Sequence, residues 1–306
     1  LIHYLEELRA EGVPIWETMD AGPQVKVLLE EVSVEPFLRR LRDHFPDAEA
    51  RVSAVGPGAR AVELEELTET ERRALGGRSV RRALSVPGNV LLLGEYAVTE
   101  PGGLGIALGS GPRALGESEP AEELSLTARF GAEERRWPEE PLPLVEVALD
   151  ALAEEGIAPE PQRLEIDTSR FYRGGRKLGF GSSAAATVLL TAHLLSAAPE
   201  ATLPEKEELF HLALKVHRRL QGGRGSGYDV AASIWGGTIT FAGGKRPEVK
   251  RAELSWLPRL YALAGREAVK SGSALESYNR WKVERPEEGE RFLRRSNELV
   301  REVLSA

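Results

Sequence analysis

The stretch KLGFGSSAAATVLL, residues 177–190, decides the fold because it joins a glycine-rich turn to a helix that begins with two serines. Gly179 and Gly181 have no side chain, so the backbone can approach a bound ligand closely. Ser182 and Ser183 supply hydroxyl groups at the point where the free N–H groups and the positive dipole end of the helix face the loop. This arrangement is typical of a site for a polyphosphate.

Two other interpretations of this loop compete with a phosphate site. A glycine turn before a helix of small residues is also common where a helix packs on a sheet. The spacing of Gly179, Gly181 and Ala184 formally matches the dinucleotide pattern G-x-G-x-x-A, but that pattern requires a strand directly before its first glycine. The preceding residues here, FYRGGRK, are polar and turn-like, and the chain contains no Walker G-x-x-x-x-G-K-[ST] sequence. We therefore retain the phosphate-loop hypothesis.

A second glycine-rich stretch, GGRGSGYDVAASIWGG at residues 222–237, places a carboxylate, Asp229, after a loop and before a run of small residues. In a partly desolvated cleft rich in phosphate, such an aspartate can orient or deprotonate a substrate hydroxyl during phosphoryl transfer. Arg224 can neutralise phosphate charge. The alternative is that Asp229 caps the helix DVAASIW, since aspartate is a favoured N-cap residue.

A third stretch, SVPGNVLLLGEYAVT at residues 85–99, contains the four consecutive aliphatic residues 90–93 between Gly88 and Gly94. Four large aliphatic residues in a row leave no face for solvent, which predicts a buried strand followed by a loop. Taken alone, this stretch is an ordinary core strand.

The composition sets limits on the class of protein. The chain has 306 residues, 42% of them hydrophobic and 29% charged, with a net charge of -8 and no cysteine. These values fit about two globular domains and disfavour disorder or a general nucleic-acid-binding surface. The absence of cysteine excludes disulfides and thiolate chemistry within the chain. No apolar run approaches the roughly 20 residues that span a bilayer. We expect a cytoplasmic protein without a membrane or nucleic-acid partner.

Periodicity and turn signals divide the chain into four parts. We expect an α+β piece at residues 1–66, a polar linker at 67–79, a larger domain at 80–245 and the start of another domain at 246–306. The patterns predict helices at 1–11, 34–45, 145–156, 182–197, 205–221 and 285–306, and strands at 24–31, 90–93, 164–169, 238–243 and 259–265.

Together, and in this order, the three stretches resemble the GHMP kinases, the superfamily of galactose, homoserine, mevalonate and phosphomevalonate kinases. The sequence GSGYDVAASIWGG is most similar to phosphomevalonate kinases. The resemblance covers residues 80–306 and implies an α+β GHMP kinase fold. In that fold a ribosomal protein S5 domain 2-like N-terminal domain precedes a ferredoxin-like C-terminal domain, of which residues 246–306 are the start. It also implies transfer of a phosphoryl group from ATP, with Mg²⁺, to 5-phosphomevalonate.

The resemblance assigns roles to individual residues. It implies that Asp229 and Lys177 are catalytic and that Ser183 also reaches the metal. The residues implied to bind ATP or phosphate are Gly179, Phe180, Gly181, Ser182, Ser183, Ala184 and Asn89. Those implied to bind the acceptor substrate are Glu95, Tyr96, Arg224 and Ser226.

Two departures from the family pattern affect these roles. Asn89 stands where the family usually has lysine or arginine, so another cation must meet the charge of the transferred phosphate, and Lys177 is our candidate. The helix HLALKVHRRLQ has no acidic residue where mevalonate kinases place a magnesium-binding glutamate. We therefore expect the ATP phosphates to supply most of the ligands of the metal ion.

Residues 10–66 resemble the C-terminal end of diphosphomevalonate decarboxylases, in which a Thr-x-Asp-Ala-Gly-Pro-Asn motif carries a catalytic aspartate. Asp20 matches that aspartate, and Gln24 replaces the asparagine. The tetrapeptide DAGP is alternatively a simple turn before a strand. Either the chain is part of a decarboxylase–kinase fusion, which we favour, or residues 1–66 complete the domain that 246–306 opens. A decarboxylase and an inactive nucleotide-binding protein are the alternative functions.

Overall fold

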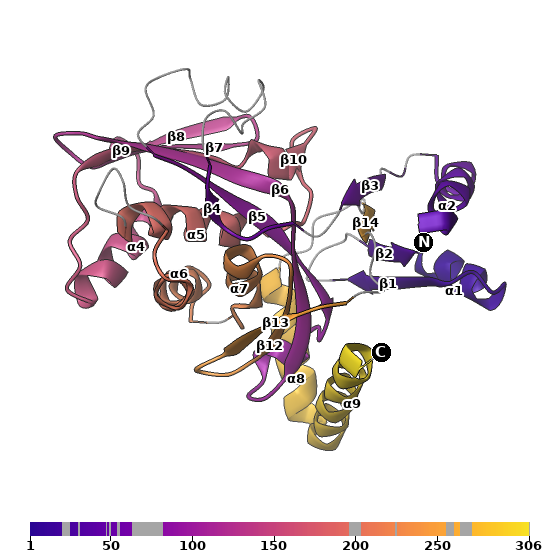
Figure 1. The fold of residues 1–306 in the computed structure, drawn as a ribbon. Coiled ribbons are helices and arrows are strands. Elements are labelled where there is room, and N and C mark those ends of the chain that lie inside the picture. Colours follow the sequence, from indigo (N-terminus) through magenta and orange to yellow (C-terminus); the bar gives the residue numbers. More distant parts are fainter. Residues whose placement is uncertain are drawn as a thin grey trace. The chain divides into compact units, whose positions relative to one another are not determined.

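The computed structural model describes most of the chain. The described residues are 1–19, 25–29, 31–46, 48, 50–53, 56–62, 82–195, 203–223, 225–254, 260–263 and 271–305. They form two compact units (Figure 1). Unit 1 consists of Leu1–Gly56, Val90–Gly111 and Gly237–Ala306, and unit 2 of Pro57–Asn89 and Pro112–Gly236. The predicted linker at 67–79 lies outside the described residues, and the four predicted parts stay predictions.

Unit 2 contains a mixed sheet. In order across the sheet, the strands are β4 (Arg60–Ala61), β5 (Arg82–Leu93), β6 (Leu104–Pro120), β9 (Gln162–Asp167), β7 (Ser125–Phe130) and β8 (Glu133–Trp137). Strand β7 is parallel to β9, whereas β9 is antiparallel to β6 and β7 is antiparallel to β8. Strands β5 and β6 are long enough to continue into unit 1.

Four helices of unit 2 pack against one another and lie together on one side of these strands (Figure 1). They are α4 (Pro143–Glu154), α5 (Ser182–Leu195), α6 (Lys206–Leu220) and α7 (Tyr228–Trp235). Helix α5 is buried from Ala184 to Leu194 and contacts each of the other three. A helix that is apolar all round is suited to such a central position, and its alanines allow close packing.

The sheet of unit 1 joins strands from opposite ends of the sequence. Strand β14 (Leu260–Leu263) lies between β2 (Val25–Leu29) and β3 (Ala50–Ser53), and β1 (Ile15–Met19) pairs with β2. All of these pairs are antiparallel. Residues of the N-terminal segment and the strand at 260–263 therefore share one sheet.

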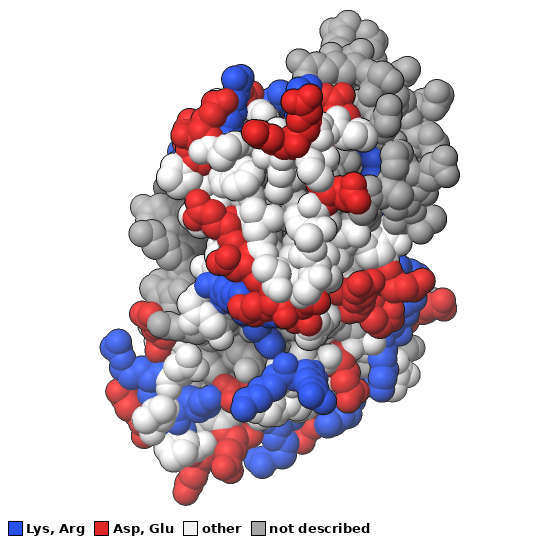
Figure 2. Space-filling view, turned by 90° about the vertical axis from the view of Figure 1, so that its left-hand side faces the viewer, with Lys and Arg blue, Asp and Glu red and all other residues white. Residues whose placement is uncertain are grey.

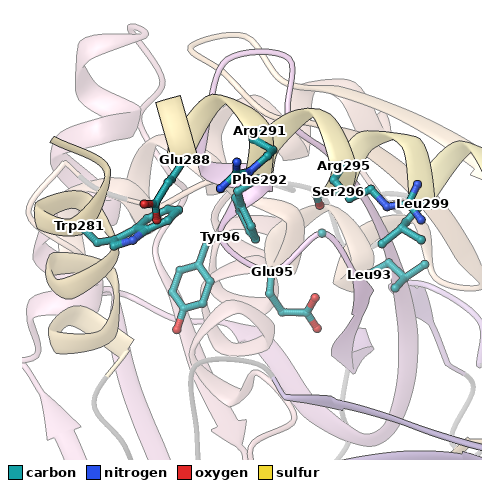
Figure 3. Close-up of a pocket in the computed structure, with 11 residues that line it drawn as sticks. Leu93, Glu95, Tyr96, Trp281, Glu288, Arg291, Phe292, Arg295, Ser296 and Leu299 are labelled. Carbon is teal, nitrogen blue, oxygen red and sulfur yellow. The ribbon is translucent and has the colours of Figure 1, made fainter. Parts of the chain in front are cut away.

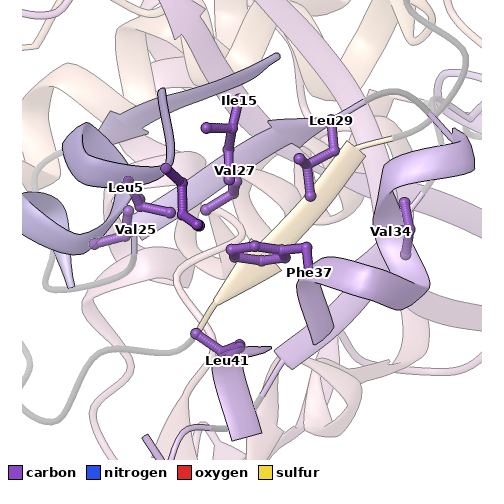
Figure 4. Close-up of a cluster of buried hydrophobic side chains, with 9 residues drawn as sticks. Leu5, Ile15, Val25, Val27, Leu29, Val34, Phe37 and Leu41 are labelled. Atoms are coloured by element: carbon purple, nitrogen blue, oxygen red, sulfur yellow. The ribbon is translucent and has the colours of Figure 1, made fainter. Parts of the chain in front are cut away.

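The N-terminal part of unit 1 has its own hydrophobic core. Helices α1 (Ile2–Ala10) and α2 (Glu31–His44) contribute apolar side chains that meet those of β1 and β2, with the ring of Phe37 among them (Figure 4). Phe37 and Leu41 lie one helical turn apart, so they occupy the same face of α2. The buried members are Leu5, Leu8, Ile15, Val25, Val27, Leu29, Val34, Phe37 and Leu41.

The segment of unit 1 from Gly237 onward adds two strands and two helices. Strands β12 (Thr238–Ala242) and β13 (Glu248–Ala252) form an antiparallel pair, and β12 also pairs with the first part of β6. Helices α8 (Ser271–Glu284) and α9 (Pro286–Ser305) contact each other. Asn297 of α9 accepts a hydrogen bond from the Leu104 backbone N–H at 2.7 Å.

Each predicted helix and strand has a counterpart in the structure, and the differences concern the start of one strand and several elements that were not predicted, among them strands β1, β3, β4 and β13. The strand predicted at 90–93 begins earlier, at Arg82, although Pro87 and Gly88 read locally as a turn. The loop predicted after this strand contains β6, β7 and β8. Helix α8 was not predicted as a separate helix.

The glycines of β6 explain why its sequence did not read as a strand. A Cβ atom at Gly116 would lie 2.9 Å from side-chain atoms of Leu189 and His193, both on α5. The glycine therefore lets α5 approach the sheet closely rather than marking a turn.

Charged side chains on the helical side of unit 2 form mixed ion pairs. The Nζ atom of Lys215 on α6 lies 2.9 Å from Glu154 and 2.6 Å from Glu155 at the end of α4. Figure 2 shows acidic and basic side chains intermixed on the face that it draws. Among the described helices, none combines the length and apolar character that spanning a membrane requires.

Candidate active site

The loop before α5 has the backbone conformation that its glycines allow. Gly179 and Gly181 have φ values of +73° and +70°, a region that other residues rarely adopt. Helix α5 begins at Ser182, and its first turn contains no acidic residue. Ser182 is partly exposed and Ser183 is exposed, whereas Ala184 is buried. The N-terminus of α5 therefore presents hydroxyls and backbone N–H groups without a neutralising carboxylate.

Asn89 joins this loop to two other elements. Its backbone N–H donates to the Phe180 carbonyl at 2.9 Å, and its side-chain amide donates to the Ser233 hydroxyl on α7 at 3.2 Å. Asn89 is only 2% exposed. A Cβ atom at Gly181 would lie 2.1 Å from the Asn89 Nδ2 atom, so only glycine fits there without movement. The three stretches that the sequence singled out thus meet around Asn89.

Gly88 brings strand β5 close to the same loop. A Cβ atom there would lie 2.5 Å from the Phe180 carbonyl oxygen and 2.8 Å from the ring of Phe171. Both phenylalanines are buried. The Pro-Gly-Asn sequence therefore serves close packing between β5 and the phosphate loop.

The loop before α7 also depends on glycines. Gly225 and Gly227 have φ values of +116° and +93°, and Gly227 is the N-cap residue of α7. Asp229 lies in the first turn of the helix, and its Oδ1 atom accepts a hydrogen bond from the Val230 N–H at 2.9 Å. Its side chain is 23% exposed. Asp229 is thus inside the helix rather than at the cap position, and its carboxylate reaches solvent.

A buried histidine stands beside Asp229. The Nε2 atom of His217 on α6 lies 3.6 Å from Asp229 Oδ2, and the His217 side chain is only 2% exposed. Gln221, the C-cap residue of α6, places its Nε2 atom 3.3 Å from the same ring nitrogen. The carboxylate therefore has one oxygen near the backbone of its own helix and the other near His217.

Arg218 shapes the loop that leads to Asp229. Its Nε atom donates to the Gly225 carbonyl at 3.1 Å, and its Nη2 atom donates to the Ser226 carbonyl at 3.1 Å. Burial lowers the pKa of Arg218 from its ordinary value. Neither His217 nor Arg218 was predicted, although a histidine between apolar positions of α6 is a signal in the sequence.

Lys177 lies on a short hairpin before the phosphate loop. Strands β10 (Tyr172–Arg173) and β11 (Arg176–Lys177) pair antiparallel, and Gly174 and Gly175 turn between them with positive φ values. Lys177 is exposed, and its Nζ atom lies 5.9 Å from the ring centroid of Tyr172. This distance fits a cation–π contact.

The other predicted site residues fall into three groups. Phe180 and Ser226 are buried, and the Ser226 hydroxyl accepts a hydrogen bond from the Tyr228 N–H at 3.5 Å. Glu95 and Tyr96 belong to unit 1. Asp20 and Arg224 lie outside the described residues, so their predicted roles stay predictions.

Glu95 and Tyr96 line a hollow of about 710 Å³ within unit 1 (Figure 3). Tyr96 has a φ of 60°, the one positive value among the described residues other than glycine, and its ring stacks on Tyr278 at 5.0 Å. The other lining residues are Leu93, Gly94, Trp281, Glu288, Arg291, Phe292, Arg295, Ser296 and Leu299.

The residues at α5 and α7 suit a nucleotide better than a metal held by protein alone. Gly181 packs against the buried side chain of Asn89, and the adjacent helix N-terminus favours anions. No group of three histidine, aspartate or glutamate side chains that could hold a metal occurs in the described part of the chain.

Comparison with known proteins shows which protein family residues 144–237 match. Residues 144–237, from α4 to the end of α7, match the family described as the GHMP kinases N terminal domain. The chain therefore contains a GHMP kinase N-terminal domain, and the predicted GHMP kinase fold is confirmed. The matched residues include both the phosphate loop and Asp229.

The chain is also similar to individual proteins of known sequence or structure. A phosphomevalonate kinase from Saccharolobus solfataricus is 32% identical over 165 residues, which cover 51% of this chain and 48% of the relative. The solved structure of a Listeria innocua protein has a TM-score of 0.59 and 24% identity, covering 73% of this chain and 72% of that one. A mevalonate kinase from Methanococcus jannaschii has a TM-score of 0.53 and 15% identity, covering 75% and 74%. These two structures show a likeness in fold.

The chain spans about half the length of the curated relatives it matches, and both of these are named phosphomevalonate kinases. The resemblance of residues 10–66 to decarboxylases stays a prediction.

Proposed function

We propose that this protein is a phosphomevalonate kinase, which transfers the γ-phosphoryl group of ATP to 5-phosphomevalonate and gives 5-diphosphomevalonate and ADP. The observation that carries the proposal is the meeting of three motifs at Asn89, which ties the phosphate loop to the helix of Asp229. The names of the similar curated proteins support the choice of acceptor.

The N-terminus of α5 would bind the ATP phosphates. Its free N–H groups and the hydroxyls of Ser182 and Ser183 are donors to phosphate oxygens, and no carboxylate in the first turn opposes them. Gly181 would let the loop pack against Asn89 and so hold the N-terminus of α5 in its position. Ser183 would also contact Mg²⁺, which supplies neutralisation of the phosphate charge when it is bound.

Asp229 would position the acceptor rather than remove a proton from it. In the proposed reaction a phosphate oxygen of the acceptor forms a bond to the γ-phosphorus of ATP, and the bond to the oxygen that bridges to the β-phosphate breaks, so that ADP leaves. That acceptor oxygen is already anionic near neutral pH. An aspartate at this place orients groups and balances charge, and a general base is not required.

Lys177 would supply the cation that Asn89 does not. Asn89 is buried and donates its amide to Ser233, so its side chain serves the packing of the three motifs. Lys177 is exposed and lies two residues before Gly179. A lysine there can meet the negative charge that develops on the transferred group.

The shared sheet of unit 1 supports one of the two explanations for the N-terminal segment. Strand β14 lies between β2 and β3, which supports the explanation that residues 1–66 complete the domain that 246–306 opens. The fusion with a decarboxylase has no such structural support within the described residues.

A panel of three acceptors tests the proposed function. The purified protein is supplied with ATP, Mg²⁺ and mevalonate, its 5-phosphate or its 5-diphosphate, and ADP and carbon dioxide are measured separately. The proposal predicts ADP formation with the 5-phosphate alone and no carbon dioxide. Turnover of mevalonate instead, carbon dioxide from the diphosphate, or no ADP with any acceptor would contradict it.

A further inference from the structure

Three polar side chains form a row that begins at Asp229 and continues onto α6. The Nε2 atom of His217 faces two groups, the Oδ2 atom of Asp229 at 3.6 Å and the side-chain amide of Gln221 at 3.3 Å. His217 is buried, whereas Asp229 is partly exposed. A buried polar ring costs free energy unless its nitrogen atoms have partners. The proposed function uses only the carboxylate of this row and leaves the other two side chains without a role.

The position of one hydrogen atom decides what His217 does for Asp229. If the amide nitrogen of Gln221 faces the ring, it donates, and the Nε2 atom of His217 accepts through its lone pair. That lone pair then also faces the negatively charged carboxylate, an arrangement that electrostatics disfavours. If the amide is turned by 180°, its oxygen faces the ring, and an Nε2–H group of His217 meets two acceptors. The second arrangement removes the repulsion and places a donor beside Asp229.

Gln221 lies against the loop that leads to Asp229. A Cβ atom at Gly225 would lie 2.3 Å from the Oε1 atom of Gln221, so the glycine leaves space for this side chain. The φ of Gly225 is +116°, a value that favours glycine. Arg218 holds the same residue by donating from its Nε atom to the Gly225 carbonyl at 3.1 Å. The loop therefore fixes the place of Gln221 next to the ring of His217.

Both oxygens of the Asp229 carboxylate then face a donor. The Oδ1 atom accepts a hydrogen bond from the Val230 N–H at 2.9 Å, and the Oδ2 atom faces His217 Nε2 at 3.6 Å. The second distance is longer than a direct hydrogen bond, but the hydrogen bonds of active sites are often long before the ligands bind. Donors from two helices, α6 and α7, restrict the rotation of the carboxylate, and a fixed orientation favours transfer between two bound groups.

We propose that His217 is the positioning residue of Asp229. Its ring has a hydrogen on Nε2 and holds the Oδ2 atom, so that the carboxylate keeps one orientation toward the acceptor phosphate. Gln221 keeps this hydrogen on Nε2 by accepting from it through the amide oxygen. The kinetic part of the inference rests on the proposed function, whereas the position of the hydrogen can be measured without any activity.

Nitrogen-15 NMR spectroscopy of the histidine rings tests the position of the hydrogen. The two ring nitrogens are distinct, so the spectrum of the full chain shows which of them is protonated. The signals of His217 are those that disappear in His217→Gln. We expect a hydrogen on Nε2. A ring with its hydrogen on Nδ1 alone would overturn the inference, because Nε2 would then accept from Gln221 and have no hydrogen to donate to Asp229.

Substitutions of His217 test its effect on turnover. His217→Leu removes the donor, so we expect kcat to fall by about tenfold to a hundredfold, the range of one hydrogen bond to a charged group. The affinity for a non-hydrolysable ATP analogue should stay within about twofold of wild type, since uniform binding is not lost. His217→Gln places an amide nitrogen near the position of Nε2, so its kcat should lie within about fivefold of wild type. His211→Leu, at an exposed position of the same helix, is the matched control and should match wild type.

A double-mutant cycle distinguishes positioning from a general structural role, because coupled residues have effects that do not add. In an Asp229→Asn background, His217→Leu should cause little further loss of kcat, since the carboxylate that His217 positions is gone. Equal losses in the Asp229→Asn and wild-type backgrounds, or a near-normal kcat of His217→Leu, would overturn the positioning role. Thermal unfolding identifies any loss of fold, and His217→Asn, whose amide is too short to reach Asp229, replaces His217→Leu if that variant does not fold.

The outcomes separate this inference from the proposed function. Absence of turnover with all three acceptors contradicts the proposed function, whereas the nitrogen-15 spectrum still decides whether His217 has a hydrogen to donate to Asp229.

Discussion

The two glycine-rich loops of unit 2 open helices of different electrostatic character. The first turn of α5 contains two serines and no acidic residue, whereas the first turn of α7 contains Asp229. Both helix ends have a positive dipole, but the one at α7 is already opposed by its own carboxylate. The two glycine loops are similar in sequence but differ in function. The N-terminus of α5 is open to an anionic ligand, whereas α7 places a fixed negative charge in the site.

The two loops also differ in the contacts that hold them in place. The α5 loop is packed so tightly against Asn89 that a side chain at Gly181 has no room. The α7 loop is held instead by hydrogen bonds from Arg218, and its carboxylate has a buried histidine, His217, as neighbour. One loop is shaped by steric fit and the other by polar contacts from α6.

The largest expected effect is that of Gly181→Val on nucleotide binding. The new side chain would collide with Asn89, and valine is strained at a φ of +70°. Strain and overpacking together should weaken ATP binding by about a hundredfold or more. Isothermal titration measures this. Gly156→Val is the matched control, because Gly156 has a similar φ of +73° in open space. Unchanged ATP affinity in Gly181→Val would contradict the assignment of residues 179–183 as the phosphate loop.

Asp229→Asn should affect turnover rather than binding. We expect kcat to fall by at least about a hundredfold with little change in the free energy of unfolding, because asparagine keeps the shape of the side chain and removes its charge. Steady-state kinetics with saturating substrates measure kcat, and Asp150→Asn on the exposed surface of α4 is the control. A fully active Asp229→Asn protein would leave Asp229 with a purely structural role.

Lys177→Met should lower the rate of phosphoryl transfer without lowering the affinity for ATP. We expect phosphoryl transfer to fall by about two orders of magnitude while ATP still binds, because the cation is needed mainly where charge develops in the transition state. Kinetics and titration on the same preparation provide the two values. Arg176→Met is the neighbouring control. Near-normal turnover of Lys177→Met would contradict the role of Lys177 and make Arg224 the next candidate for the cation.

The smallest expected effect is that of Asn89→Ala. This change removes the hydrogen bond to Ser233 and leaves space beside Gly181, so it should destabilise the protein by about 1–2 kcal/mol. Turnover should fall less than in Lys177→Met. Denaturant unfolding of Asn89→Ala, Ser233→Ala and the double variant measures the coupling. A drop in kcat as large as that of Lys177→Met, without destabilisation, would instead place Asn89 at the reacting phosphates.

The sequence allowed prediction of those parts of the site that depend on local chemistry. The phosphate loop, the helix that follows it and the glycine loop before Asp229 each have their own signal within about 15 residues. The partners of Asp229 lack such a signal because His217 and Arg218 lie on a separate helix, α6, and reach the loop only through packing. The contact of Lys177 with Tyr172 was missed for a related reason, since it depends on the register of a hairpin with a two-residue turn.

The fold was predictable where hydrophobic periodicity is strong. Helices α4, α5, α6 and α9 fall within the predicted ranges, give or take two residues. Strand β6 was not predicted, because glycines such as Gly116, which allows close packing against α5, interrupt its pattern. Strands β7 and β8 were not predicted either. The insertion of β14 between β2 and β3 joins residues more than 200 positions apart in the sequence, and no local pattern indicates such a pairing.

The most direct test of the division between the two loops compares Gly181→Val and Asp229→Asn in a single experiment. Both variants are titrated with a non-hydrolysable ATP analogue and then assayed with ATP and 5-phosphomevalonate. The account predicts that Gly181→Val loses nucleotide binding, whereas Asp229→Asn binds the analogue as wild type does and loses turnover. Normal analogue binding by Gly181→Val, or loss of binding by Asp229→Asn with its fold intact, would contradict the assignment of phosphate binding to α5 and of the catalytic carboxylate to α7.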